Sequence, residues 1–328
     1  MKNWKHPLDF SWPVLTENKN LRTEVPDIEA FFESARREAE SLPREGNVVR
    51  DEKLVEFCPC PICGSADTRQ AFVKYGFIYA DCRECGHLYV KNRLREDVLL
   101  GLYQDSRTDK LDRKVKTSAP HLDYWGQLHE KYLTLIGSLG ISNRNALDVG
   151  SGAGTFLKNL CAMTDLAAHG LDFCEDTFED IVALIGRENY YYRLRMEDVD
   201  FGDKRFGLIT LWGVLEHLVD PLSVLTRCAE VLAPDGRVLL LIPNAHSRAL
   251  RILGVQTPTL HPRGHINLCT QSSFALLAKK AGLTIERRFQ ELPVIDLMHP
   301  FISYSEELVR EIVDANEAYY DVYLLRRA

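Results

Sequence analysis

The stretch "NALDVGSGAGTFLKNL", residues 145–160, places three glycines within five positions directly after a short apolar run. The apolar run predicts a strand, and the residues after the glycines predict a helix. A glycine-rich turn between a strand and a helix presents backbone N–H groups to a nucleotide-like ligand, because glycine lets the ligand approach closely. Counted from Gly150, the dinucleotide fingerprint needs a sixth-position glycine where this chain has Thr155. The turn therefore predicts a site for a nucleotide-like ligand, but it does not match the fingerprint of dinucleotide-binding proteins.

Strand-like and helix-like segments alternate from this turn onward. The predicted strands cover residues 145–150, 167–173, 190–196, 207–213 and 237–244, with two later strands at 283–289 and 320–327. The predicted helices cover about 154–163, 175–186, 221–232 and 271–281. This alternation predicts an α/β fold with a mostly parallel sheet that helices cover on both faces.

The composition is that of a globular chain with a sizeable core: 328 residues, 45% hydrophobic, with a net charge of −7. No apolar run approaches the roughly 20 residues of a membrane span, and the N-terminus lacks the apolar core of a signal peptide, so we expect a cytoplasmic protein. The acidic balance argues against nucleic acid and favours a small-molecule substrate. A local basic set could grip an anionic substrate or be an ordinary solvated loop: His246, Arg248, Arg251, His261 and Arg263.

Five of the nine cysteines lie between residues 58 and 85. Cys60, Cys63, Cys82 and Cys85 follow the spacing Cys-x2-Cys-x18-Cys-x2-Cys, which is typical of four thiolates around one zinc ion. Four protein ligands leave the metal no open position, so we expect structural rather than catalytic zinc. Cys58 and His87 are alternative ligands that the sequence leaves open. The alternating segment between the two pairs predicts strands, so this unit resembles a zinc ribbon.

These features divide the chain into four predicted parts. Residues 1–57 form a helical arm, 58–90 the zinc-ribbon-like module, 91–140 a helical linker with cofactor-capping helices, and 141–328 the domain that begins with the glycine turn. The arm contains one amphipathic helix, which either docks on the rest of the protein or serves as a substrate lid or dimer clasp. The sequence leaves the oligomeric state open.

The motif Asp148-Val149-Gly150-Ser151-Gly152-Ala153-Gly154 resembles the first motif of class I S-adenosylmethionine-dependent methyltransferases. The resemblance implies a Rossmann-like domain with a seven-stranded, mostly parallel sheet and an antiparallel last strand. The segments "LEH", "DP" and "LAPDG", with the later "GHINLCT", are similar to the ubiquinone-biosynthesis-type branch of that family. Together these matches cover about residues 120–290.

The resemblance also implies which residues hold the cofactor. Asp148 lies near its ammonium group and Asp172 near its ribose hydroxyls. Met196 lies near its adenine, together with Glu197 or, as the open alternative, Asp198. The full set implied for S-adenosyl-L-methionine is Asp148, Gly150, Ser151, Gly152, Gly154, Asp172, Phe173, Met196, Glu197, Leu211 and Trp212.

Methyl transfer to a hydroxyl needs a positioned acceptor and a base that removes its proton. His217 and His265 are the candidate bases, because histidine accepts a proton near neutral pH. We therefore expect a methyltransferase that acts on a hydroxyl, or a carbon, of a small molecule such as a sugar, nucleotide sugar or surface glycan precursor. Two alternatives stay open: an RNA or protein methyltransferase whose zinc ribbon recognises the macromolecule, and a non-catalytic binding protein on the same fold.

Overall fold

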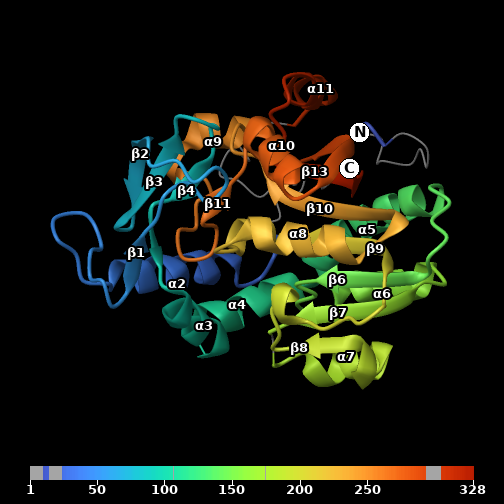
Figure 1. Ribbon diagram of the computed structural model, residues 1–328. Coiled ribbons are helices and arrows are strands. Elements are labelled where there is room, and N and C mark those ends of the chain that lie inside the picture. Colours follow the sequence, from blue (N-terminus) through green and yellow to red (C-terminus); the bar gives the residue numbers. More distant parts are fainter. Residues whose placement is uncertain (1–9, 15–23, 106, 174, 293–303) are drawn as a thin grey trace.

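The computed structural model describes residues 10–14, 24–105, 107–173, 175–292 and 304–328, so parts of the predicted arm lie outside the described residues (Figure 1). Within these ranges the largest sheet has seven strands in the order β12-β13-β10-β9-β6-β7-β8. Their bounds are β6 Asn145–Val149, β7 Ala167–Asp172, β8 Tyr190–Tyr192, β9 Phe206–Trp212, β10 Leu232–Pro243, β12 Leu283–Glu291 and β13 Tyr320–Arg327. Only β13 runs antiparallel to its two neighbours among these strands, which confirms the predicted Rossmann-like methyltransferase fold with its antiparallel last strand.

Alternate side chains of these strands enter two separate cores. Leu147, Ile209 and Leu240 pack on one face, and Leu208, Leu239 and Leu241 on the other. Helices α8 (Pro221–Val231) and α10 (Gln271–Lys280) cover the first face, while α5 (Ala119–Gly137), α6 (Thr155–Met163) and α7 (Phe178–Ile185) cover the second (Figure 1). Burying both faces requires apolar side chains at nearly every strand position, which is the pattern the sequence shows.

Two strand boundaries differ from the sequence prediction by four residues or more. The third strand, β8, ends at Tyr192 instead of residue 196, because Arg193 has a positive φ of 56° that breaks the extended backbone. Strand β10 begins at Leu232, five residues earlier than predicted, and its pairing with β9 is irregular between Leu232 and Arg237. Two helices were not among those predicted from the sequence. Helix α9 (Arg248–Leu253) follows β10, and α11 (Glu306–Asp314) lies in the connection before β13.

The cysteine-rich segment forms a second sheet that the rest of the chain completes. Its order is β11-β4-β3-β2, with β2 Thr68–Lys74, β3 Phe77–Cys82 and β4 Leu88–Val90 from the segment itself. The fourth strand, β11 (Asn267–Leu268), comes from the connection between β10 and α10 and pairs antiparallel with β4. A short pair of strands, β1 (Val55–Phe57) and β5 (Asn92–Leu94), joins the two ends of the segment. The segment is thus built into the molecule and not merely attached to it.

The described part of the N-terminal arm docks on the protein. Helix α2 (Ile28–Glu40) buries Ile28, Ala35 and Ala39 and packs against α4 (Arg107–Lys116), which follows α3 (Glu96–Asp105) (Figure 1). None of the helices in the described ranges is both long and apolar enough to cross a membrane.

Candidate cofactor and acceptor site

The glycine turn after β6 adopts a backbone that other residues tolerate poorly. Gly150, Gly152 and Gly154 have φ values of 74°, 50° and 70°, in the left-handed region. A Cβ on Gly150 would lie 2.6 Å from Cγ2 of Val214, so the turn lies directly against the segment after β9. A Cβ on Gly152 would meet no atom nearer than 4.0 Å, so the backbone there faces open space. This combination leaves room for a ligand beside the turn.

Asp172 holds the turn from the end of the neighbouring strand. Its Oδ2 accepts a hydrogen bond of 2.7 Å from the backbone N–H of Gly152, and the hydroxyl of Thr177 donates to the carbonyl of Gly152. A carboxylate has lone pairs for further donors, so Asp172 can still accept from a ligand hydroxyl.

Asp148 lies beneath the turn and is 2% exposed. Its Oδ1 accepts a hydrogen bond of 2.7 Å from the hydroxyl of Thr210. Burial raises the pKa of this carboxyl to about 7, and the Asp172 charge adds to the rise. The hydroxyl of Ser151 is also buried, without a hydrogen-bond partner among the described residues. A ligand that carries an ammonium and a carboxylate would satisfy both groups, so the residues fit the methionine part of S-adenosylmethionine.

The other predicted cofactor residues differ in exposure. Phe173 is 38% exposed and Glu197 is exposed, so both can meet a ligand. Trp212 is half-buried, and its indole N–H has no acceptor among the described residues. Met196 and Leu211 are buried and belong to the core that α8 covers, and their place beside the cofactor stays a prediction. On β9 the difference in exposure follows from the alternation of side chains, which points Leu211 and Trp212 to opposite faces.

The two candidate bases lie together, and the structure adds Glu216 of the "LEH" segment, to which the sequence analysis gave no chemical role. Glu216, His217 and His265 offer side-chain atoms that all lie within 4.8 Å of one another, and the two imidazole rings are 4.8 Å apart. His217 belongs to the turn Leu215–His217 after β9, and His265 to the segment before β11. Since Val214 of the same turn contacts Gly150, this acceptor-side cluster adjoins the glycine turn.

Burial sets the protonation of the cluster. It lowers the pKa of His265 to about 4 and holds the pKa of His217 well below its ordinary value, so both imidazoles are neutral at pH 7. Burial raises the pKa of Glu216 to about 8, and its Oε2 has no partner among the described residues. Nδ1 of His265 lies 2.9 Å from the carbonyl oxygen of Thr259. A carbonyl only accepts, so Nδ1 carries the proton and Nε2 keeps a free lone pair.

The guanidinium groups of the predicted basic set form ion pairs with carboxylates. Arg248 and Arg251 both pair with Glu317. The guanidinium of Arg263 is 5% exposed and pairs with Glu38 of α2 and with Asp109 of α4, in the latter case at 2.6 Å. His261 is neutral, because burial holds its pKa well below the ordinary value. The arrangement does not support the suggested grip on an anionic substrate.

The four predicted metal ligands converge at the knuckles of the cysteine segment. The sulfur atoms of Cys60 and Cys85 are 3.6 Å apart, those of Cys63 and Cys82 are 3.4 Å apart, and all four lie within 4.8 Å of one another. Four thiolates bound to zinc at about 2.3 Å are separated by about 3.8 Å, so the donor set fits structural zinc.

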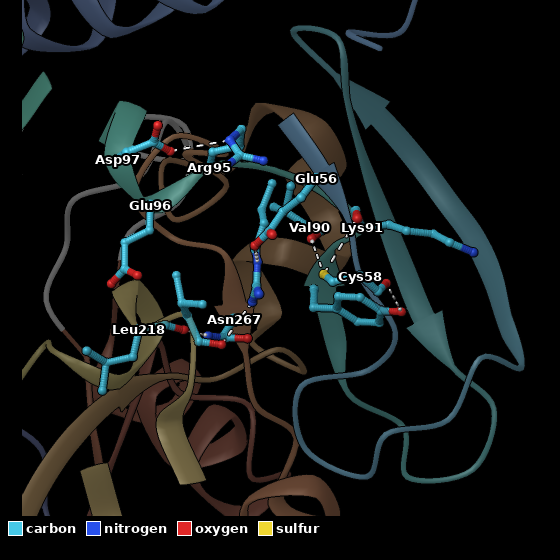
Figure 2. Close-up of polar contacts among 12 residues, drawn as sticks. Glu56, Cys58, Val90, Lys91, Arg95, Glu96, Asp97, Leu218 and Asn267 are labelled. Carbon is cyan, nitrogen blue, oxygen red and sulfur yellow. Dashed lines mark hydrogen bonds and ion pairs between the residues drawn. The ribbon is translucent and has the colours of Figure 1, made fainter. Parts of the chain in front are cut away.

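The two alternative ligands point elsewhere. Figure 2 shows the thiol of Cys58 directed at the backbone carbonyls of Val90 and Lys91, at 3.8 and 3.6 Å. His87 is fully buried, and its Nε2 bonds to the side chain of Asn267. The geometry therefore favours the original four cysteines.

Comparison with known proteins agrees with this geometry. A family model described as "Methyltransferase domain" matches residues 124–288, from α5 to β12. The chain belongs to this family. It is therefore an S-adenosylmethionine-dependent methyltransferase.

Individual relatives are distant. The Thiobacillus denitrificans protein named ubiquinone biosynthesis O-methyltransferase is 30% identical over 158 residues, covering 44% of this chain and 67% of the relative. The Nautilia profundicola protein named tRNA U34 carboxymethyltransferase is 31% identical over 105 residues, covering 31% of this chain and 35% of the relative. The solved magnesium protoporphyrin IX methyltransferase of Synechocystis aligns with a TM-score of 0.48 and 12% identity, covering 71% of this chain and 100% of that one.

Proposed function

We propose that this methyltransferase transfers the methyl group of S-adenosylmethionine to a hydroxyl of a small molecule, with His265 as the base. The observation that carries the proposal is the cluster of two neutral imidazoles and one buried carboxyl directly beside the glycine turn. The O-methyl transfer named for the Thiobacillus denitrificans relative supports a hydroxyl over a carbon acceptor.

The cofactor would lie between the turn and the ends of β6, β7 and β9. Asp148 and Ser151 would hold its methionine part, Gly150 and Gly152 would leave space for it, and Asp172 would bind its ribose. The bound cofactor supplies an electrophilic methyl group on a sulfonium. The unpartnered indole N–H of Trp212 would then gain an acceptor at the same edge of the sheet.

The acceptor hydroxyl would lie against the histidine cluster, which is partly open to solvent. Nε2 of His265 would take the hydroxyl proton as the oxygen bonds to the methyl carbon and the bond from that carbon to the cofactor sulfur breaks. The sulfonium would leave as a neutral thioether, and the imidazole would become the cation. Glu216 and His217 stand next to that cation. Release of the Glu216 proton to solvent would leave a carboxylate beside that imidazolium and would stabilise its charged form.

The acceptor is proposed to be an uncharged hydroxyl compound, with sugars and other polyols among the candidates. The paired guanidiniums of Arg248, Arg251 and Arg263 leave no evident grip for a diphosphate in this loop. A macromolecular acceptor receives less support, since the cysteine segment uses its knuckles and β4 to pack on its own chain. Zinc in the four-cysteine centre is part of this proposal and serves structure, not the transfer itself.

The test uses S-adenosylmethionine with a tritiated methyl group and a panel of sugars, polyols and phenols. We expect label in at least one hydroxyl compound, and a loss of about 100-fold or more in kcat for His265→Ala. His265→Asn is the matched variant, because its amide can donate to Thr259 as Nδ1–H does but cannot take a proton. Recovery of the rate in His265→Asn would show a structural histidine, and label found only in RNA or protein would overturn the small-molecule acceptor.

A further inference from the structure

The segment that carries His265 is shared between the methyltransferase sheet and the cysteine segment. Ile266 lies between them: its carbonyl accepts from the N–H of Val90 in β4, and its own N–H donates to the carbonyl of Glu216, at 2.9 and 2.8 Å. The segment that carries His265 is therefore one hydrogen bond away from β4, and the turn that carries Glu216 and His217 is two hydrogen bonds away.

A buried side-chain relay runs parallel to this backbone connection. Nε2 of His87, two residues after Cys85, lies 3.2 Å from Oδ1 of Asn267. The amide group of Asn267 donates to the carbonyl of Leu218 at 2.6 Å and to that of Leu215 at 3.4 Å, which are the residues on either side of Glu216 and His217. His87 and Asn267 are 0% and 4% exposed, so the hydrogen bond between them is shielded from water. Figure 2 shows the amide of Asn267 directed at Leu218.

A second connection reaches the same turn from β5. The guanidinium of Arg93 donates to the carbonyl of Val219 at 2.8 Å and is held by Glu56 of β1, also at 2.8 Å. Glu56 stands two residues before Cys58, at the entry to the cysteine segment (Figure 2). The carbonyls on either side of Glu216 and His217 thus accept from Asn267, which contacts His87, and the carbonyl of Val219 accepts from Arg93, which Glu56 holds at the edge of the cysteine segment.

We propose that Asn267, held by His87, is a positioning residue through which the four-cysteine centre sets the geometry of the acceptor-side histidines. The knuckle formed by Cys82 and Cys85 fixes the start of β4 and with it His87. Loss of the metal would loosen the knuckle and the start of β4, and would leave the His87 ring with its contact to the hydroxyl of Ser273, 3.4 Å from Nδ1, so the amide of Asn267 would be oriented less firmly toward the turn. This inference rests on the proposed function, in which the histidines act on the acceptor, but its test does not require methyl transfer.

The experiment compares zinc-loaded and chelator-treated wild-type protein with Asn267→Ala and Asn267→Asp. Asn267→Asp keeps an acceptor for His87 and loses the donor to Leu218, so it serves as the second variant if the alanine variant does not fold. Ser272→Ala is the matched control. The hydroxyl of Ser272 donates to the carbonyl of Cys85 across the same interface, but Ser272 belongs to α10 and not to the connection between His87 and the turn. Zinc is counted by mass spectrometry, histidine ring signals are followed by NMR, and backbone hydrogen exchange is measured at residues 213–219.

We expect Asn267→Ala to retain one zinc and its affinity for S-adenosylmethionine, to shift the ring signals of His217 and His265, and to speed exchange at 213–219 by about tenfold, the effect of one buried hydrogen bond. Removal of zinc from the wild type should give the same changes, and in Asn267→Ala it should add nothing further at this turn. Ser272→Ala should behave as wild type.

The inference would be overturned if zinc removal and Asn267→Ala had additive effects on hydrogen exchange at residues 213–219. It would also be overturned if the ring signals of His217 and His265 did not change when the metal is removed. Loss of protection in β6 and β7 together with the turn would also overturn it, because the centre would then support the whole domain. None of these readouts depends on an acceptor. A failed transfer assay with intact coupling would therefore count against the proposed function and not against the relay.

Discussion

The affinity for S-adenosylmethionine should depend on pH through Asp148. The pKa of this carboxyl is raised to about 7 by burial, whereas an ammonium group beside it requires the charged form. At pH 6 about one molecule in eleven is ionised, and at pH 7.5 about three in four, so we expect binding to be roughly eightfold weaker at pH 6. Isothermal titration calorimetry at the two pH values measures the ratio, and proton release on binding at pH 6 provides a second readout.

The sign of the effect also follows for stability. Without ligand, Asp148 binds more protons in the native state than in the unfolded chain. Its contribution to the free energy of unfolding is therefore present at low pH and is lost as pH rises through about 7. Stabilisation by the cofactor should therefore grow over the same range. Thr210→Val removes the hydroxyl that favours the carboxylate, and should move the pH dependence of binding upward. Equal affinity at pH 6 and 7.5, or an unchanged slope in Asp148→Asn, would refute the reasoning.

Three further outcomes follow from the structure. Gly150→Ala should lower the denaturant midpoint and abolish cofactor binding by calorimetry, because its Cβ would meet Val214 and its φ is positive. Lys131→Met should cost about 3–5 kcal/mol of unfolding free energy in denaturant titration, since it leaves the buried carboxylate of Glu291 without its cation; a cost below 1 kcal/mol would contradict this. Cys63→Ser should lose its zinc and melt at a lower temperature, whereas a metal-free variant that melts normally would exclude structural zinc.

The sequence was sufficient for the elements whose physical signals are local. The glycine turn, the apolar strands and the cysteine spacing each depend on residues close together in the chain, and the structure has each of them. The end of β8 at Tyr192 could not be predicted from the sequence, because an arginine side chain does not indicate the positive φ that Arg193 adopts. The burial of Met196 in the core that α8 covers depends on packing between distant segments, which the sequence does not show.

Residues brought together from distant segments were the ones the sequence analysis missed. Glu216 belongs to the named "LEH" segment, but its role beside His265 depends on a contact across nearly fifty positions. The partners of Arg263 on α2 and α4 are even farther away, so a guanidinium that looked free in the sequence is paired in the fold. The conformation of β11, only two residues long, has no periodicity from which to predict a strand.

The pairing of β11 with β4 has a consequence for protein synthesis. A chain growing from the ribosome delivers the four cysteines early, but the strand that completes their sheet emerges only after Leu268 has been made. Until then the nascent segment exposes an unpaired strand edge at β4, a feature that invites wrong pairing and aggregation. With zinc in the four-cysteine centre, as proposed above, early capture of the metal would keep the knuckles closed during that interval. Metal supply during translation should then govern how much of this protein reaches its native state.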